Sequence, residues 1–188
     1  MIKTIKEPYT ETQLKAVLHP LINEWFFSKF KSFSLPQLHG VMEIHQRRNV
    51  LISAPTGATK TLTGFLAILN ELVDSAKKKI LEDKVYAIYI SPLKALNYDI
   101  HFNLLNPLKE MEDINGEPLG IRTAVRTGDT TAYEKSKMLK HVPHILITTP
   151  ESLAIMINSP KFKEKLTDVQ WVLIDEIHAL ADNKRGVH

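Results

Sequence analysis

Short apolar runs rich in β-branched residues alternate with helix-like stretches from Asn49 onward. Such runs, bounded by turn residues, are typical of buried strands. The predicted strands are residues 50–53, 85–91, 121–125, 145–148 and 169–175, and the predicted helices between them are 61–76, 94–105, 133–140 and 150–157. Strands that alternate with helices form a mostly parallel sheet with helices on both faces. The pattern therefore predicts an α/β fold.

A different region precedes the first predicted strand. It contains a helix predicted at residues 36–45 and five large aromatic residues, most of which we expect in the core, because large rings chiefly bury area: Trp25, Phe26, Phe27, Phe30 and Phe33. Residues 111–120 contain Asn115-Gly116 and Pro118, which favour a turn. We expect one domain, 1–188, with N-terminal helices in 1–48 and a core in 49–188.

The amino-acid composition excludes few classes of binding partner. The formal charge is +3, with 24 basic and 21 acidic residues, which permits a polyanionic partner without requiring one. The absence of cysteine excludes disulfides and thiolate metal sites. No apolar run reaches the length of a membrane span, so we expect a soluble, cytoplasmic protein with no membrane partner.

Residues 54–61 follow a predicted strand and open a predicted helix, which is the context of a phosphate-binding loop. Backbone N–H groups there can surround a polyphosphate, Lys60 can meet its outer phosphates, and the Thr61 hydroxyl can hold Mg²⁺. The usual pattern has glycine where Thr59 stands, which leaves the affinity for ATP open. The candidate binding residues are Pro55, Thr56, Gly57, Ala58, Thr59, Lys60 and Thr61.

The strand predicted at 169–175 ends in the acidic pair Asp175-Glu176. Carboxylates at the end of a parallel strand project toward the sheet edge where such folds bind ligands. Asp175 can bind Mg²⁺, and Glu176 can orient or deprotonate an attacking water. The alternative is a helix start that favours acidic residues.

The order of these segments resembles that of the superfamily 2 ATP-dependent helicases of the DEAD/DEAH type, and within them the large helicase-related (Lhr) family, over almost the whole chain. The resemblance implies a RecA-like P-loop NTPase domain that uses ATP and Mg²⁺. Gln37 looks like the glutamine that contacts adenine, and His178 completes an Asp-Glu-x-His motif, so it joins Lys60, Asp175 and Glu176 as a catalytic candidate.

Three further segments look like the nucleic-acid-contacting motifs of that family. Each follows a predicted strand, where hydroxyl and N–H groups suit phosphate oxygens and carry no base specificity. We therefore expect contact with the sugar-phosphate backbone of DNA or RNA. Glu151 stands at capping-box spacing from Thr148, which adds a helix-capping role. The candidates are Pro92, Lys94, Arg126, Thr127, Gly128, Asp129, Thr149, Pro150 and Glu151.

Ten residues follow His178. In the resembled family a Ser/Thr-Ala-Thr motif and a second RecA-like domain follow, so we expect a fragment truncated after the acidic motif, with a gap in its sheet and no strand separation on its own.

The predicted function is the ATP-binding domain of an ATP-dependent DNA or RNA helicase, which couples hydrolysis to movement on nucleic acid in the complete protein. The Lhr resemblance favours DNA repair by analogy. The alternative is a nucleic-acid-binding module whose ATPase is impaired by Thr59 and by the missing second domain. A third possibility is a chain that forms no stable fold by itself.

Overall fold

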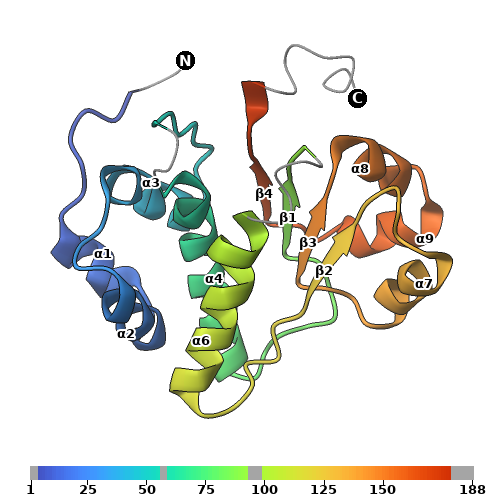
Figure 1. Cartoon of the computed structure of the whole chain (residues 1–188), viewed down its shortest axis with the longest axis horizontal. Coiled ribbons are helices and arrows are strands. Elements are labelled where there is room, and N and C mark those ends of the chain that lie inside the picture. Colours follow the sequence, from blue (N-terminus) through green and yellow to red (C-terminus); the bar gives the residue numbers. More distant parts are fainter. Residues whose placement is uncertain (1–3, 56–58, 93–98, 179–188) are drawn as a thin grey trace. The chain divides into compact units, whose positions relative to one another are not determined.

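The computed structural model describes residues 4–55, 59–92 and 99–178 (Figure 1). The chain divides into two compact units. Unit 1 consists of Met1–Ile80 and Asp99–Leu119, and unit 2 consists of Leu81–Tyr98 and Gly120–His188. The expectation of a single domain over residues 1–188 stays a prediction.

Unit 2 contains a sheet of four parallel strands in the order β2-β3-β1-β4. The strands are β1 (Ala87–Ile90), β2 (Thr123–Arg126), β3 (Ile145–Thr148) and β4 (Trp171–Ile174). Ala87 of β1 pairs with both Ile145 and Trp171, and Thr123 of β2 also pairs with Ile145. This register ends all four strands at one level, and it confirms the predicted α/β fold with a parallel sheet.

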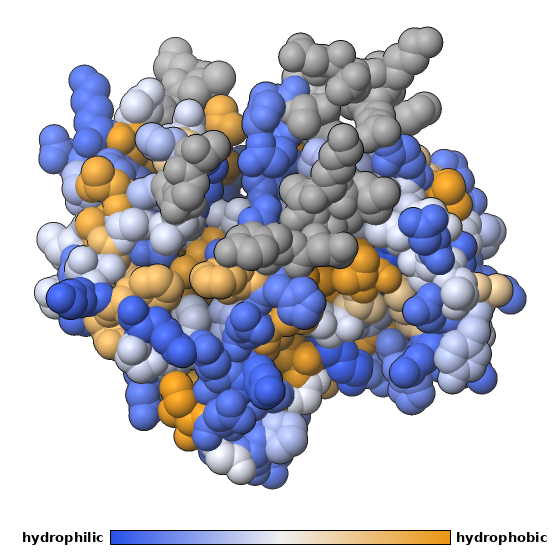
Figure 2. All heavy atoms as spheres, viewed as in Figure 1, coloured by the Kyte–Doolittle hydropathy of each residue, from blue (hydrophilic) through white to orange (hydrophobic). Residues whose placement is uncertain are grey.

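Three helices of unit 2 form a common core with one face of this sheet. They are α7 (Ala132–Lys140), α8 (Pro150–Ile157) and α9 (Pro160–Lys163), which continues into the 3-10 turn η2 (Glu164–Leu166). Met138, Met156 and Phe162 of these helices cluster with Ile88, Ile90 and Leu146 of the strands. Figure 2 shows mainly hydrophilic side chains on the outer side of this helical layer, with scattered hydrophobic ones. The helices therefore present one apolar face to the strands.

Unit 1 is helical. Its elements are α1 (Glu11–Val17), α2 (Pro20–Lys29), α3 (Leu35–His45), α4 (Lys60–Lys77), the π-helical segment η1 (His101–Leu105) and α6 (Asn106–Asn115). The predicted aromatic core is confirmed for Trp25, Phe26 and Phe33, which are buried. The Phe26 and Phe33 rings stack with their centroids 4.5 Å apart. Phe33 directly precedes Ser34, the N-cap residue of α3, so this stack packs the chain just before that helix begins.

Residues 50–53 do not form a strand, contrary to the sequence prediction. Extended backbone becomes a strand only when a neighbour completes the hydrogen-bond ladder, and within the described part of the chain no strand pairs with this segment. Ile52 packs against α3 instead, since a Cβ on Gly40 would come within 2.8 Å of Ile52 Cδ1 and of Thr63 Cγ2. Glycine at position 40 thus permits close packing of α3, α4 and this segment.

The turn predicted at residues 111–120 is also corrected. Residues 111–115 belong to α6, and the chain turns only at Gly116, whose φ of 75° is left-handed. The helix continues because Leu108 and Met111 are both buried, three positions apart on one face. The predicted helix at 94–105 is confirmed over residues 99–105, while 94–98 lie outside the described residues. No helix among the described residues is both long and apolar enough to cross a membrane.

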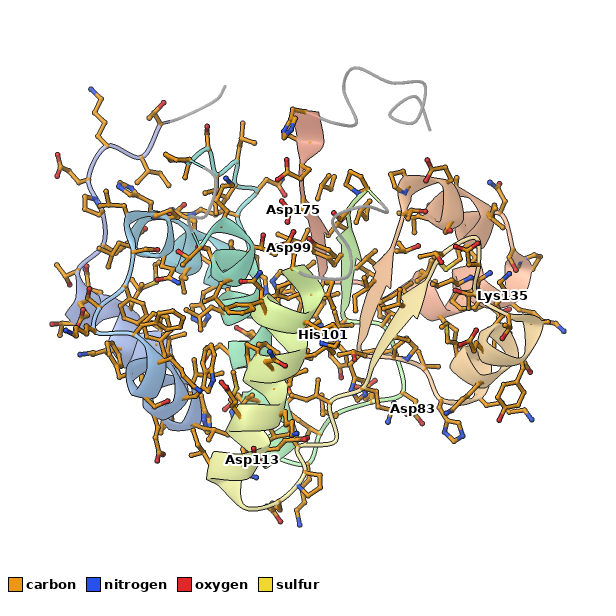
Figure 3. The ribbon with its side chains drawn as sticks, viewed as in Figure 1. Asp83, Asp99, His101, Asp113, Lys135 and Asp175 are labelled. Atoms are coloured by element: carbon orange, nitrogen blue, oxygen red, sulfur yellow. The ribbon has the colours of Figure 1, made fainter. Side chains whose placement is uncertain are left out.

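A buried histidine lies at the amino end of the sheet in unit 2. His144 is 1% exposed, and its Nδ1 accepts a hydrogen bond of 3.0 Å from the Arg122 backbone N–H. The same arginine pairs with Asp83, which Figure 3 places at the end of the sheet opposite Asp175. Burial, followed by the nearby Arg122 charge, lowers the pKa of His144 from 6.5 to about 4.

This shift predicts a pH-dependent stability. Between pH 6.5 and about 4 the unfolded chain binds a proton at His144 that the folded chain does not. The stabilisation is fully present above pH 6.5 and is lost as the pH falls through this window, by up to about 1.4 kcal/mol per pH unit. Urea unfolding of His144→Asn, which keeps an acceptor for Arg122, should show a shallower pH slope. Equal slopes in the two proteins would contradict this assignment.

Candidate nucleotide and nucleic-acid sites

The ends of the phosphate loop are described in unit 1. Lys60 is the first residue of α4, and its Nζ donates to the carbonyl oxygens of Ala54 at 2.7 Å and Pro55 at 3.1 Å. An ammonium group has three donors, and two of them hold the beginning of the loop against the start of the helix. Thr61 follows on the first turn of α4 and is half-buried, whereas Thr56, Gly57 and Ala58 lie outside the described residues.

Thr59 occupies the usual glycine position with a negative φ. Its φ of −67° lies in a region that any residue adopts. Its carbonyl accepts from the backbone N–H of Thr63 and from the Thr63 hydroxyl at 2.7 Å, so it caps the start of α4. The Thr59 hydroxyl is hydrogen-bonded to that of Ser34, the residue that precedes α3. The loop is therefore tied to the start of another helix of unit 1.

Gln37 lies on the first turn of that helix. Its Oε1 accepts from the Ser34 backbone N–H at 2.8 Å, and the side chain is 1% exposed. Its Nε2 is buried and has no hydrogen-bond partner among the described residues. A buried donor without a partner is costly, so this amide fits a ligand that brings an acceptor. An amide can pair with both N6 and N7 of adenine.

The motif residues of unit 2 gather at one edge of the sheet. Because the four strands end in register, the segments that follow β2, β3, β1 and β4 lie next to one another in that order. These segments carry Thr127 to Asp129, Thr149 to Glu151, Pro92, and Asp175 with Glu176. Figure 3 shows Asp175 at this edge. The structure thus brings together the predicted nucleic-acid residues and the acidic pair, except for Lys94, which lies outside the described residues.

Tyr89 and Glu176 both donate hydrogen bonds to Asp175. The Tyr89 hydroxyl donates to Asp175 Oδ2 at 2.8 Å, and the Glu176 backbone N–H donates to Asp175 Oδ1 at 2.9 Å. Glu176 adopts a left-handed φ of 50°, which costs on the order of 1 kcal/mol for a residue with a side chain. The Glu176 carboxylate lies 3.0 Å from His178 Nε2. Asp175, Glu176 and His178 therefore form one connected group.

The cap of α8 differs from the prediction by one residue. Thr149, not Thr148, precedes the helix, and its hydroxyl accepts from the Ser152 backbone N–H at 3.4 Å. Thr148 is not the cap because it belongs to β3 and its hydroxyl donates to the Arg126 carbonyl at 2.7 Å. The predicted capping box of Thr148 with Glu151 is therefore wrong, and Glu151 is exposed in the first turn.

Arg126 is the one residue of its segment that turns inward. It is 8% exposed, and its guanidinium carbon lies 4.0 Å from the centre of the Phe162 ring in the helical core. Burial lowers the pKa of Arg126 below its usual value. By contrast, Gly128 and Asp129 are exposed, and a Cβ on Gly128 would meet nothing within 4 Å. The exposed part of this segment is thus the Gly128-Asp129 turn.

Sequence reasoning missed two residues, Ser34 and Tyr89. Ser34 has a local signal, since it stands three residues before Gln37 at a helix start. Tyr89 has none, because its partner Asp175 is 86 positions away in the sequence.

A family model described as DEAD/DEAH box helicase matches residues 34–188. The chain belongs to this family. It is 56% identical over 191 residues to the ATP-dependent helicase Lhr-Core of Methanothermobacter thermautotrophicus, with 100% of the chain and 22% of that relative covered. It is 39% identical over 189 residues to the Lhr helicase/uracil glycosylase of Escherichia coli, with 96% of the chain and 12% of that relative covered.

Among solved structures, the Mycobacterium smegmatis helicase Lhr bound to ssDNA and AMP-PNP matches with a TM-score of 0.79 and 38% identity, over 91% of this chain and 22% of that one. The DEAD-box helicase Mss116 bound to ssRNA and UDP-BeF matches with a TM-score of 0.74 at 23% identity, over 95% and 35% of the two chains, and shows the fold alone. The predicted RecA-like helicase fold and the Lhr resemblance are confirmed. The chain spans about a fifth of the length of the Lhr-Core relatives.

The contact between Ser34 and Thr59 predicts a measurable coupling. Ser34→Ala and Thr59→Val each remove one hydroxyl, and each should lower the free energy of unfolding by about 0.5–1.5 kcal/mol. Because both changes break the same hydrogen bond, the double variant should lose less than the sum of the two single losses. Urea unfolding of the four proteins measures this cycle. Strictly additive losses would show that the hydroxyl groups do not interact.

Proposed function

We propose that this chain is the nucleotide-binding part of an ATP-dependent nucleic-acid motor, and that Gln37 and Lys60 bind ATP through its base and its phosphates. The main support for the proposal is the state of two side-chain nitrogen donors in unit 1, Gln37 Nε2 and Lys60 Nζ. Gln37 Nε2 is buried without a partner among the described residues, and Lys60 Nζ holds the two carbonyls that begin the loop.

The remaining roles follow from the chemistry of the side chains. Backbone N–H groups of residues 56–61 suit a polyphosphate, whereas Pro55 has no N–H and contributes its carbonyl oxygen to Lys60. Thr61 and Asp175 supply oxygen ligands of the kind that Mg²⁺ prefers. Glu176 orients or deprotonates the attacking water, and its carboxylate contacts His178 Nε2. When bound, Mg²⁺ would neutralise phosphate charge.

The rival function, a nucleic-acid-binding module with an impaired ATPase, is not better supported. Its main argument is that a side chain at position 59 obstructs the phosphate. Thr59 has an ordinary φ, and its hydroxyl contacts Ser34 of the neighbouring helix. The backbone φ therefore does not require glycine at position 59, and the Thr59 hydroxyl is engaged by Ser34.

Calorimetry with MgATP tests the proposal. Lys60→Ala should weaken binding by about tenfold or more, since a hydrogen bond to a charged group contributes roughly 1.5–3 kcal/mol. Lys77→Ala is the matched control, because Lys77 lies at the far end of the same helix and bonds Asn115 there. The two variants carry the same change in charge. Equal affinities in both variants, or no binding by the parent chain, would refute the proposed site.

We further propose that the carboxyl edge of the unit 2 sheet contacts the sugar-phosphate backbone of a single strand. The support is the alignment of Pro92, the Thr127 to Asp129 segment and the Thr149 to Glu151 segment along one edge. The related helicase of Mycobacterium smegmatis is described as bound to ssDNA. By analogy with the Lhr relatives, the proposal includes a role in DNA repair.

Gly128→Val tests this edge. The site is exposed and open around the added Cβ, so the melting temperature should stay within the error of the parent value. The affinity for oligodeoxythymidylate, measured by fluorescence anisotropy, should fall about tenfold because the side chain blocks the approach of phosphate. Ser136→Val, on the exposed face of α7, is the control. Unchanged affinity in Gly128→Val would exclude this segment from the interface.

A further inference from the structure

We propose that Tyr89 is a positioning residue for the cation-binding aspartate, and that its hydroxyl sets the affinity of Asp175 for Mg²⁺. The inference rests on the proposed function, in which Asp175 binds the cation. Tyr89 itself contacts neither cation nor nucleotide in this proposal. It acts by fixing one carboxylate oxygen.

The sheet register brings the two side chains together. Tyr89 pairs with Leu173 in the neighbouring strand, and Asp175 stands two residues beyond Leu173. Side chains two residues apart on a strand point to the same face, so Tyr89 and Asp175 share one face of the sheet. The Asp175 backbone N–H donates to the Ile90 carbonyl at 2.9 Å, which extends the ladder to the aspartate itself. The hydroxyl of Tyr89 then reaches Asp175 Oδ2 at 2.8 Å.

Burial of Tyr89 restricts the orientation of this hydrogen bond. Tyr89 is fully buried, so its ring has one packed orientation and its hydroxyl requires a partner inside the protein. The partner is the carboxylate whose other oxygen accepts the Glu176 N–H at 2.9 Å. Because Tyr89 donates to one oxygen and Glu176 to the other, rotation of the carboxylate about its Cβ–Cγ bond would break both contacts. Each carboxylate oxygen has two lone pairs, so it can accept one donor and still face a cation.

A second tyrosine, Tyr86, directly precedes the same strand and has a purely structural contact. Tyr86 is also buried, and its hydroxyl accepts from the Glu82 backbone N–H at 3.1 Å near the amino end of the sheet. That contact anchors a loop and involves no candidate ligand. Tyr86 is therefore a matched control for loss of a buried phenolic hydroxyl.

The test measures ATP binding by calorimetry in EDTA and over a series of Mg²⁺ concentrations. We compare the parent chain with Tyr89→Phe, Tyr86→Phe and Asp175→Asn. Tyr89→Phe should bind ATP in EDTA as the parent does, and should need about tenfold more Mg²⁺ for half of the magnesium-dependent gain in affinity. Asp175→Asn should need at least as much. Tyr86→Phe should match the parent. Replacement of Tyr89 by 3-fluorotyrosine keeps the hydroxyl, and should restore the parental magnesium dependence.

The outcomes separate the two proposals. A shift in Asp175→Asn without a shift in Tyr89→Phe would overturn the positioning role and leave the proposed function intact. No shift in Asp175→Asn, or no magnesium dependence in the parent chain, would overturn the cation role of Asp175 and this inference with it. Equal loss of ATP affinity by Tyr89→Phe in EDTA and in Mg²⁺ would indicate a general packing defect and would also overturn the positioning role.

Discussion

The parallel pairing of β1 with both β3 and β4 is the constraint on which unit 2 depends. It places β1 inside the sheet and ends the four strands at one level, so four separate segments share one edge. The same register sets Tyr89 on the face of Asp175 and thereby joins a core position to a candidate ligand. A shift of one residue between β1 and β4 would turn Tyr89 and Asp175 to opposite faces. The hydrogen-bond ladder between β1 and β4 thus positions both a core side chain, Tyr89, and a candidate cation ligand, Asp175.

In unit 1, the candidate binding residues lie at the starts of two helices, α3 and α4. The stack of Phe26 on Phe33 packs the chain just before α3 begins, and the first turn of α3 carries Gln37. Ser34 connects that turn to Thr59, which begins α4 and is followed by Lys60. The aromatic cluster thus packs just before the helix start that carries the candidate base-binding amide. The Ser34–Thr59 contact therefore joins the start of α3 to the start of α4.

Elements that depend on the local sequence pattern were predicted correctly. Elements that depend on contacts with residues distant in the sequence were not. The strand at residues 145–148 and the helix at 150–157 were predicted to the residue, because one is a buried apolar run and the other begins with a capping threonine and proline. Residues 50–53 have the same strand pattern but no described neighbour to pair with. Residues 111–115 carry turn-like composition nearby, yet burial of Met111 keeps them helical. The motif residues were found from the sequence, whereas the Tyr89 contact depends on register between distant strands.

The central claim is that Lys60 and Gln37 are held ready for a nucleotide, and a crystal structure of this chain with Mg²⁺ and AMP-PNP tests it most directly. We predict that Lys60 Nζ contacts a phosphate oxygen while it keeps at least one of the loop carbonyls, and that Gln37 Nε2 donates to the adenine ring. AMP-PNP bound away from both side chains, or Lys60 still on both carbonyls with no phosphate contact, would contradict the account.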